Sequence, residues 1–126
     1  MVITKTPTRA GFEAVFQSNR FKCAFITASE QYAFGKITEL KRHNDSDEVF
    51  VLLQGKAVLL TRDQGSSQHE ITLLCPNTAY NVASGTWHYL AVSDDAVVFV
   101  AESGTMEKEN TQTINIEAEE LVLPEQ

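Results

Sequence analysis

Short apolar runs separated by turn-forming residues dominate this sequence and most restrict what the chain can fold into. Clusters of Gly, Asn, Asp and Ser interrupt it at residues 44–47, 63–67, 77, 84–85 and 93–95. The runs between these clusters are rich in Val, Ile, Leu, Phe and Thr, a pattern typical of an all-β domain. We predict strands at residues 22–28, 34–41, 48–53, 57–62, 70–74, 80–82, 86–92, 97–102 and 113–116.

The two ends of the chain depart from this pattern. Phe12, Val15 and Phe16 have the i, i+3, i+4 spacing of one helical face, which predicts a short N-terminal helix docked on the domain. Residues 117–126 form an acidic tail. We expect a helical turn in the first part of this tail and fraying in its last residues.

Length and charge exclude several classes of protein. The 126 residues suit a single domain that buries its own core. The net charge of −7 comes without any cluster of Lys and Arg, which excludes a nucleic-acid partner. No run reaches the roughly 20 consecutive apolar residues of a membrane span, so we expect no membrane partner and a cytoplasmic location. We interpret Cys23 and Cys75 as two buried thiols in a reducing compartment.

Several predicted strands are apolar on both faces. The strand at 48–53 carries Phe50 and Leu52 on one face and Val49 and Val51 on the other. A half-exposed antiparallel strand would show polar residues on its outer face. The outer face must therefore be covered by another sheet, a terminal segment or a second subunit, and we predict a homodimer.

Charged residues share one face of a neighbouring predicted strand. Alternation along KITELKRHN places Ile37, Glu39, Lys41 and His43 on one face and Leu40 on the other. Each buried ionised group costs several kcal/mol unless it is paired. If this face points inward, its ionisable groups require partners.

Two stretches resemble the motifs of the cupin superfamily and of its small single-domain members. In the first, His43, Glu48 and Gly55 are separated by four and six residues, as in the family. In the second, Gly85 and His88 stand in SGTWH at the family's spacing. Asn77 and Ala83 replace the Gly and Pro of the family's second motif.

This resemblance implies a jelly-roll β-barrel with a core at about residues 20–116 and an acidic tail at 117–126. In many members a pocket at the barrel mouth holds a divalent metal ion between three His and one Glu. The matching ligands here are His43, Glu48 and His88, whereas the first His of the family's motif falls on Lys41.

Two interpretations of the site follow. In one, His43, Glu48 and His88 bind iron, manganese, nickel or zinc and leave open coordination positions. Lys41 then pairs with Glu39, because a protonated Lys repels a metal ion. In the other, no metal is bound, Lys41 pairs with Glu48, and the two histidines hydrogen-bond a small polar or anionic molecule.

The function follows the same division. The protein either binds a small molecule, or is a metal-dependent lyase, isomerase or oxygenase acting on a small carboxylate or sugar-like substrate. Candidate catalytic residues are His43, His88 and Lys41, and the expected pocket residues are Glu39, Lys41, Phe50 and Tyr80. His69, in a turn-like segment, is expected to be a surface residue.

Overall fold

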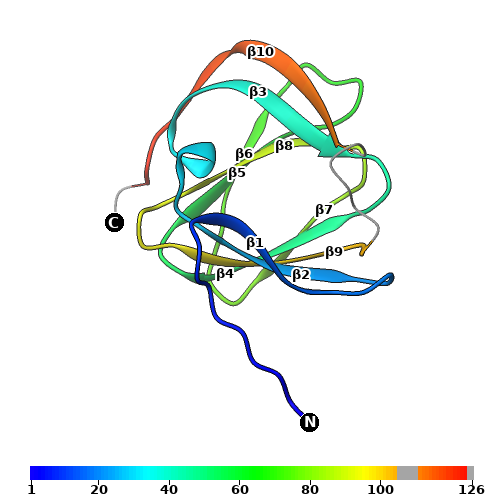
Figure 1. Ribbon diagram of the computed structural model, residues 1–126. Helices are drawn as coiled ribbons and strands as arrows, with labels where there is room; N and C mark the ends of the chain where they lie inside the picture. Colours follow the sequence, from blue (N-terminus) through cyan, green and yellow to red (C-terminus); the bar gives the residue numbers. More distant parts are fainter. Residues whose placement is uncertain (105–110, 125–126) are drawn as a thin grey trace.

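Two antiparallel β-sheets face each other and enclose the core, as Figure 1 shows. The structure, a computed structural model, describes residues 1–104 and 111–124. Its strands are β1 (Gly11–Gln17), β2 (Lys22–Thr27), β3 (Gly35–His43), β4 (Glu48–Gln54), β5 (Ala57–Arg62), β6 (Glu70–Leu73), β7 (Ala79–Val82), β8 (Trp87–Val92), β9 (Val97–Glu102) and β10 (Thr111–Leu121). A 3₁₀ turn, η1 (Glu30–Tyr32), lies between β2 and β3.

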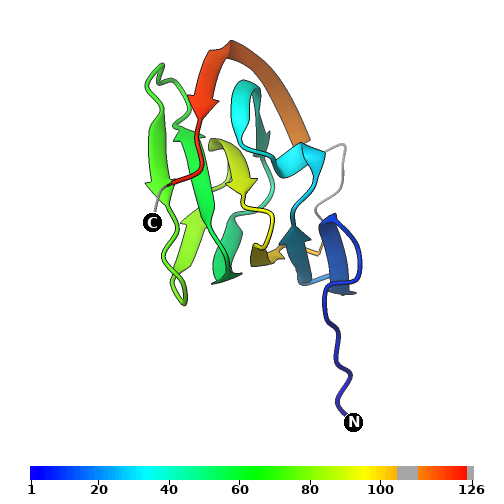
Figure 2. The same cartoon turned by 90° about the vertical axis from the view of Figure 1, so that its left-hand side faces the viewer.

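Each sheet contains five strands. Sheet A has the order β1-β2-β9-β4-β7, and sheet B has the order β10-β3-β8-β5-β6. The chain passes from one sheet to the other between β2 and β3, β3 and β4, and β4 and β5, as a jelly roll does. Figures 1 and 2 both show the N-terminal residues leading away from the sheets. The predicted all-β jelly-roll fold is confirmed.

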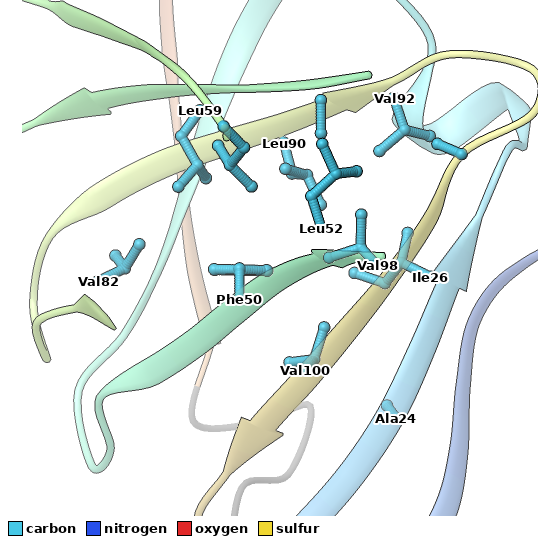
Figure 3. Packing of buried hydrophobic residues seen from close by; sticks show 13 residues of the cluster. Ala24, Ile26, Phe50, Leu52, Leu59, Val82, Leu90, Val92, Val98 and Val100 are labelled. Carbon is cyan, nitrogen blue, oxygen red and sulfur yellow. The ribbon is translucent and has the colours of Figure 1, made fainter. Parts of the chain in front are cut away.

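The main core fills the space between the sheets. Figure 3 shows Phe50, Leu52 and Val98 of sheet A pointing toward Leu59 and Leu90 of sheet B. Each of these side chains is at most 4% exposed. Burying one such side chain stabilises the fold by about 1.5–3 kcal/mol, so this layer holds the two sheets, and the strand ends that carry the site, in fixed positions.

A second apolar cluster lies on the outer face of sheet B. Leu59 packs in the main core, whereas the adjacent Leu60 packs in the outer cluster with Trp87 and Leu121. Both faces of β5 are therefore buried. The cover is the chain's own C-terminal strand, because Ile114 and Leu121 of β10 pack in this cluster.

The outer face of sheet A remains apolar and half-exposed. Phe25, Phe99 and Val51 occupy one row across β2, β9 and β4. The rings of Phe25 and Phe99 meet edge to face with their centroids 6.0 Å apart. All three side chains are half-buried, so this row is a candidate contact surface.

The predicted N-terminal helix is wrong. Phe12, Val15 and Phe16 lie on strand β1, which pairs with β2. The register shifts between Ala14 and Phe16, which leaves Val15 as an extra residue in a β-bulge. A bulge reverses the in–out phase of the residues after it, and this reversal produced an apolar spacing that imitates a helix.

The C-terminal expectation is also corrected. Residues 117–121, predicted as a helical turn of the tail, belong to β10, where residues 119–121 pair with 35–37 of β3. Leu121 is only 3% exposed, and burial of its side chain favours the extended pairing. Residues 125–126 of the predicted tail lie outside the described residues.

The two cysteines are less buried than predicted. Cys23 is half-buried on β2, and Cys75 is exposed after β6. Both are free thiols. The expectation of two buried apolar thiols is therefore wrong.

Candidate metal centre

Three side chains from three strands converge at one end of the space between the sheets. His43 ends β3, Glu48 begins β4, and His88 lies on β8. The Nε2 atom of His43 is 3.4 Å from Oε1 of Glu48, and the Nε2 atom of His88 is 3.3 Å from the same oxygen. The potential ligand atoms of all three residues lie within 4.8 Å of one another. The structure thus brings together the three residues that the sequence singled out.

Hydrogen bonds between two loops position these strand ends. The backbone N–H of Gly85 donates to the carbonyl of His43 at 2.8 Å. The backbone N–H of Ser84 donates to Oδ1 of Asp47 at 2.8 Å, and the hydroxyl of Ser84 donates to the carbonyl of Asn44 at 2.8 Å. The backbone N–H of Ser84 is also what chiefly lowers the pKa of Asp47. These bonds join the loop before β4 to the loop before β8.

Both motif glycines have a backbone requirement. Gly55, in the β4–β5 turn, has φ +78°, and a Cβ atom there would lie 2.6 Å from Cα of Ala96. Gly85 has φ +84° and forms the loop bond to His43. An L side chain is strained in this left-handed region, so each glycine fixes a turn beside a strand that carries a candidate ligand.

Each imidazole is oriented through its second nitrogen. Nδ1 of His88 lies 3.0 Å from the carbonyl oxygen of Thr86, which can only accept a hydrogen bond. Nδ1 therefore carries a proton, and in a neutral ring Nε2 presents its lone pair toward Glu48. Nδ1 of His43 lies 2.9 Å from the hydroxyl of Thr111 on β10. Such partners on the far nitrogen are characteristic of metal-binding histidines.

Glu48 is a buried carboxylate between these imidazoles. Its residue is 5% exposed, and Oε1 has no hydrogen-bond partner among the described residues. Burial raises the pKa of Glu48, but the adjacent His43 and His88 lower it more, to about 2. In return, Glu48 raises the pKa of His43, against the opposing effects of burial and of the Lys41 charge.

The three residues fit a divalent metal ion. Nitrogen and oxygen ligands about 2.0–2.2 Å from one ion are separated from each other by roughly 3.0–3.5 Å, and the contacts of Glu48 with the imidazoles are 3.3 and 3.4 Å long. Oε1 of Glu48, which has no hydrogen-bond partner among the described residues, would gain a positively charged partner. Two histidines and one carboxylate are a donor set suited to iron, manganese, nickel or zinc.

Neither expected partner of Lys41 is found. Among the described residues, the ion pairs within 4 Å join Glu48 to the two histidines and do not join Lys41 to Glu48 or to Glu39. Lys41 is half-buried and lines the cavity next to the histidines. The strand face predicted to carry Ile37 together with the charged residues is also shorter than expected. Ile37 packs in the outer cluster with Leu40, which was predicted to lie on the opposite face.

Glu102 is a site residue that sequence reasoning missed. It lies opposite Glu48 in the pairing of β9 with β4, and opposite Lys22 in the pairing of β9 with β2. Oε1 of Glu102 is 3.7 Å from Nζ of Lys22. Burial and the charge of Glu48 raise the pKa of Glu102 to about 7. The sequence did contain a signal for it: Glu102 follows Val98 and Val100 at every second position of the strand, which places it on the same inward face as these core residues.

A cavity of about 710 Å³ adjoins the three residues. Phe50, Glu39 and Lys41 line it as expected, and Tyr32 of η1 lines it as well. Burial, followed by the charges of Glu48 and Glu102, raises the pKa of Tyr32. A cavity of this size accommodates a small molecule.

Tyr80 and His69 lie away from this cavity. We expected Tyr80 to line the pocket, but its side chain packs against the main core, and its hydroxyl accepts a hydrogen bond from the backbone N–H of Cys75 at 2.8 Å. His69, expected at the surface, is half-buried, with Nδ1 3.6 Å from Oε1 of Glu119. His69 does not contribute to the metal centre.

Comparison with known proteins identifies the fold. No protein-family model matches the chain, and no curated protein matches its sequence. Among solved structures, an RmlC-like cupin with a double-stranded β-helix fold from Methanocaldococcus jannaschii superposes with a TM-score of 0.56 at 13% identity, over 81% of this chain and 86% of that one. The chain has the cupin fold.

Other cupin-fold matches are longer proteins. The capsular polysaccharide assembling protein CapF from Staphylococcus aureus matches with a TM-score of 0.60 at 12% identity, over 91% of this chain and 31% of that one. QdtA, a sugar 3,4-ketoisomerase from Thermoanaerobacterium thermosaccharolyticum, matches with a TM-score of 0.58 at 14% identity, over 71% of this chain and 64% of that one. This chain therefore spans about a third of CapF and 64% of QdtA.

At these identities the likeness concerns the cupin fold and not the activity.

Within residues 1–104 and 111–124, no helix has the length and apolar character needed to cross a membrane.

Proposed function

We propose that this protein binds one divalent transition-metal ion through His43, Glu48 and His88, and a small polar molecule in the adjoining cavity. The observation that carries the proposal is Oε1 of Glu48. This buried oxygen has no hydrogen-bond partner among the described residues, yet two imidazole Nε2 atoms point to it from 3.3 and 3.4 Å. A metal ion bound to all three groups gives each of them a partner.

The position of Lys41 supports the metal over the metal-free interpretation. In the metal-free interpretation the Lys41 ammonium pairs with Glu48, and among the described residues no such ion pair is found within 4 Å. Without another cation, Glu48 relies on protonated imidazoles to neutralise its charge. His88 already uses its Nδ1 proton on the carbonyl of Thr86, which leaves Nε2 free as a ligand.

Iron, manganese, nickel and zinc all suit this donor set. When bound, such an ion polarises an oxygen of the ligand or activates a water molecule. The chain's own residues do the remaining work. Thr111 and the carbonyl of Thr86 orient the two imidazoles, and Tyr32 and Phe50 shape the cavity wall.

An enzymatic role is the second candidate, as a metal-dependent lyase, isomerase or oxygenase on a small carboxylate or sugar-like substrate. The observation that favours it is the number of ligands. Three protein ligands leave coordination positions open for substrate, whereas structural zinc sites are closed by four. As metal ligands, His43 and His88 would not act as general bases, so their predicted catalytic role applies only to a metal-free pocket.

Metal analysis of the untagged protein tests the proposal. After exposure to iron, manganese, nickel and zinc in turn and removal of free ions, we expect one ion per chain for at least one metal. His88→Ala should lose this ion. The matched control is His69→Ala, which removes a half-buried histidine paired with Glu119 and should keep it. No stoichiometric metal in the wild-type protein, or equal retention in both variants, would overturn the proposal.

A further inference from the structure

Lys41 occupies a position between a neighbouring strand and a metal ligand. It lies directly opposite His88 in the pairing of β3 with β8, and opposite Thr113 in the pairing of β3 with β10. Residues directly opposite each other in an antiparallel pair have Cβ atoms about 4.5–5.5 Å apart. Lys41, His43 and His88 all line the same cavity. The Lys41 side chain therefore lies at the edge of the proposed metal centre.

Apart from the exposed Glu39, the other charged groups around the cavity are already engaged. Nζ of Lys22 lies 3.7 Å from Glu102, and Glu48 contacts both histidines. Lys41 makes no ion pair within 4 Å among the residues that the structure describes. Taking a Lys partly out of water without a counter-charge is unfavourable, so a half-buried Lys facing a cavity is well placed to bind an anion.

The net charge of this region favours an anion too. A divalent ion bound to Glu48 and two neutral imidazoles leaves one positive charge, and Lys41 adds a second next to it. Glu39 also lines the cavity, but it is exposed, and water and salt screen its charge. The cavity of about 710 Å³ limits the anion to a small molecule.

We propose that Lys41 recognises the carboxylate of a small organic acid, a second oxygen of which takes an open position beside His43, Glu48 and His88. The location of that second oxygen rests on the proposed function, whereas the ion pair with Lys41 does not. The lysine at this position thus determines ligand class, because it selects an anionic acid over its neutral analogue. A flexible ammonium donates up to three hydrogen bonds and suits a carboxylate of variable orientation.

Binding of matched acids and amides tests this inference. The probes are acetate, lactate and malonate at millimolar concentration, each paired with its neutral amide, and binding to metal-free and zinc-loaded protein is followed by NMR shifts. We expect the wild-type protein to bind at least one acid in preference to its amide. Lys41→Met should weaken that binding about tenfold, and Lys41→Arg should restore most of it. Lys36→Met, which removes an exposed lysine from the same strand, is the control and should bind as wild type does.

The outcomes separate this inference from the metal proposal. Zinc bound normally by Lys41→Met together with undiminished acid binding would overturn the role of Lys41 alone. Failure of every form to retain iron, manganese, nickel or zinc would overturn the metal proposal. The metal-free titration would then decide the role of Lys41 by whether Lys41→Met loses acid binding. A wild-type protein that binds none of the acids, or binds amides equally well, would also overturn the inference.

Discussion

Glu48 and Glu102 lie directly opposite each other on β4 and β9, and their surroundings move their pKa values in opposite directions. The imidazoles of His43 and His88 outweigh burial and hold the pKa of Glu48 at about 2. Burial and the charge of Glu48 raise the pKa of Glu102 to about 7. Two adjacent carboxyl groups thus remain compatible because one is ionised and the other takes up a proton readily.

Replacing Glu102 should change how stability depends on pH. The pKa of Glu102 is raised from 4.5 to about 7, so the folded state retains its proton more strongly than the unfolded state does. Its contribution is fully present below pH 4.5 and is lost as pH rises through 7. For metal-free protein we expect Glu102→Gln to be more stable than wild type at pH 8, by about 1–2 kcal/mol after allowance for solvent screening, and no such gain at low pH.

Urea unfolding at pH 8 and pH 4.5 in the presence of a chelator measures this difference. The control is Glu120→Gln, which removes an exposed carboxylate from β10 and should have little effect at either pH. An equal gain at both pH values would show that Glu102 acts through packing and not through its charge.

Thr111 should support metal affinity without contacting the metal. Its hydroxyl lies 2.9 Å from Nδ1 of His43 and fixes the orientation of that ring. Loss of such a partner typically lowers metal affinity 10- to 100-fold. We expect Thr111→Val to show a loss in this range in competition with a chromogenic chelator, and Thr113→Val, which changes the next cavity-lining threonine on β10, to show almost none. Equal affinities of the two variants would contradict the role of Thr111.

The homodimer remains a prediction, and the outer face of sheet A is its proposed interface. Phe25, Phe99 and Val51 form an uncharged row on a chain of net charge −7, and two acidic chains approach each other most easily through such a surface. We expect a dimer in sedimentation at micromolar concentration and a monomer for Phe99→Glu. Ile71→Glu, which places the same charge on the 58% exposed Ile71 of sheet B, should remain dimeric. A monomeric wild-type protein would rule out this interface.

Glu13 of β1 should hold the N-terminal arm, residues 1–10, against the domain in a pH-dependent manner. Its carboxylate accepts hydrogen bonds from the hydroxyl of Thr8 at 2.6 Å and from the backbone N–H groups of Thr8 at 2.8 Å and Arg9 at 3.2 Å. These bonds, chiefly the one from the Thr8 hydroxyl, lower the pKa of Glu13 from 4.5 to about 2. The attachment is fully present above pH 4.5 and is lost as pH falls through 2.

Hydrogen exchange at the Thr8 and Arg9 amides measures this attachment. At neutral pH we expect wild-type protection at these amides and little protection in Glu13→Gln, whose neutral side chain is a weaker acceptor. Glu30→Gln, which alters an exposed residue of η1, is the control. Unchanged protection in Glu13→Gln would mean that the arm is held by other contacts.

The fold and the convergence of the three candidate ligands were predictable because both follow from local spacing. Strands β5 and β9 have the predicted bounds, and His43, Glu48 and His88 meet as the motif spacing implies. The helix expected at Phe12–Phe16 failed because a bulge at Val15 changes the phase of β1, and the resulting apolar spacing matches that of one helical face.

The remaining site residues depend on how distant strands align. Glu102 and Thr111 reach the site only through the pairings of β9 with β4 and of β10 with β3. Alternation predicted which way Lys41 points, but not which carboxylate it would reach, because a side chain with four rotatable bonds can choose among several neighbours. Its actual separation from Glu48 required the three-dimensional structure.

The hydrogen bonds between the loop before β4 and the loop before β8 have a consequence for how this chain could have evolved. In two of these bonds one partner is a main-chain atom and the other is a side-chain atom, whereas both partners of the Gly85–His43 bond are main-chain atoms. The only side chains in these bonds are those of Asp47 and Ser84, which do not line the cavity, so the spacing of the barrel mouth is nearly independent of the cavity-lining side chains. Lys41 can therefore stand where the family's motif has a histidine without moving its neighbours. The mouth acts as a rigid frame in which a single substitution changes the chemistry of the site.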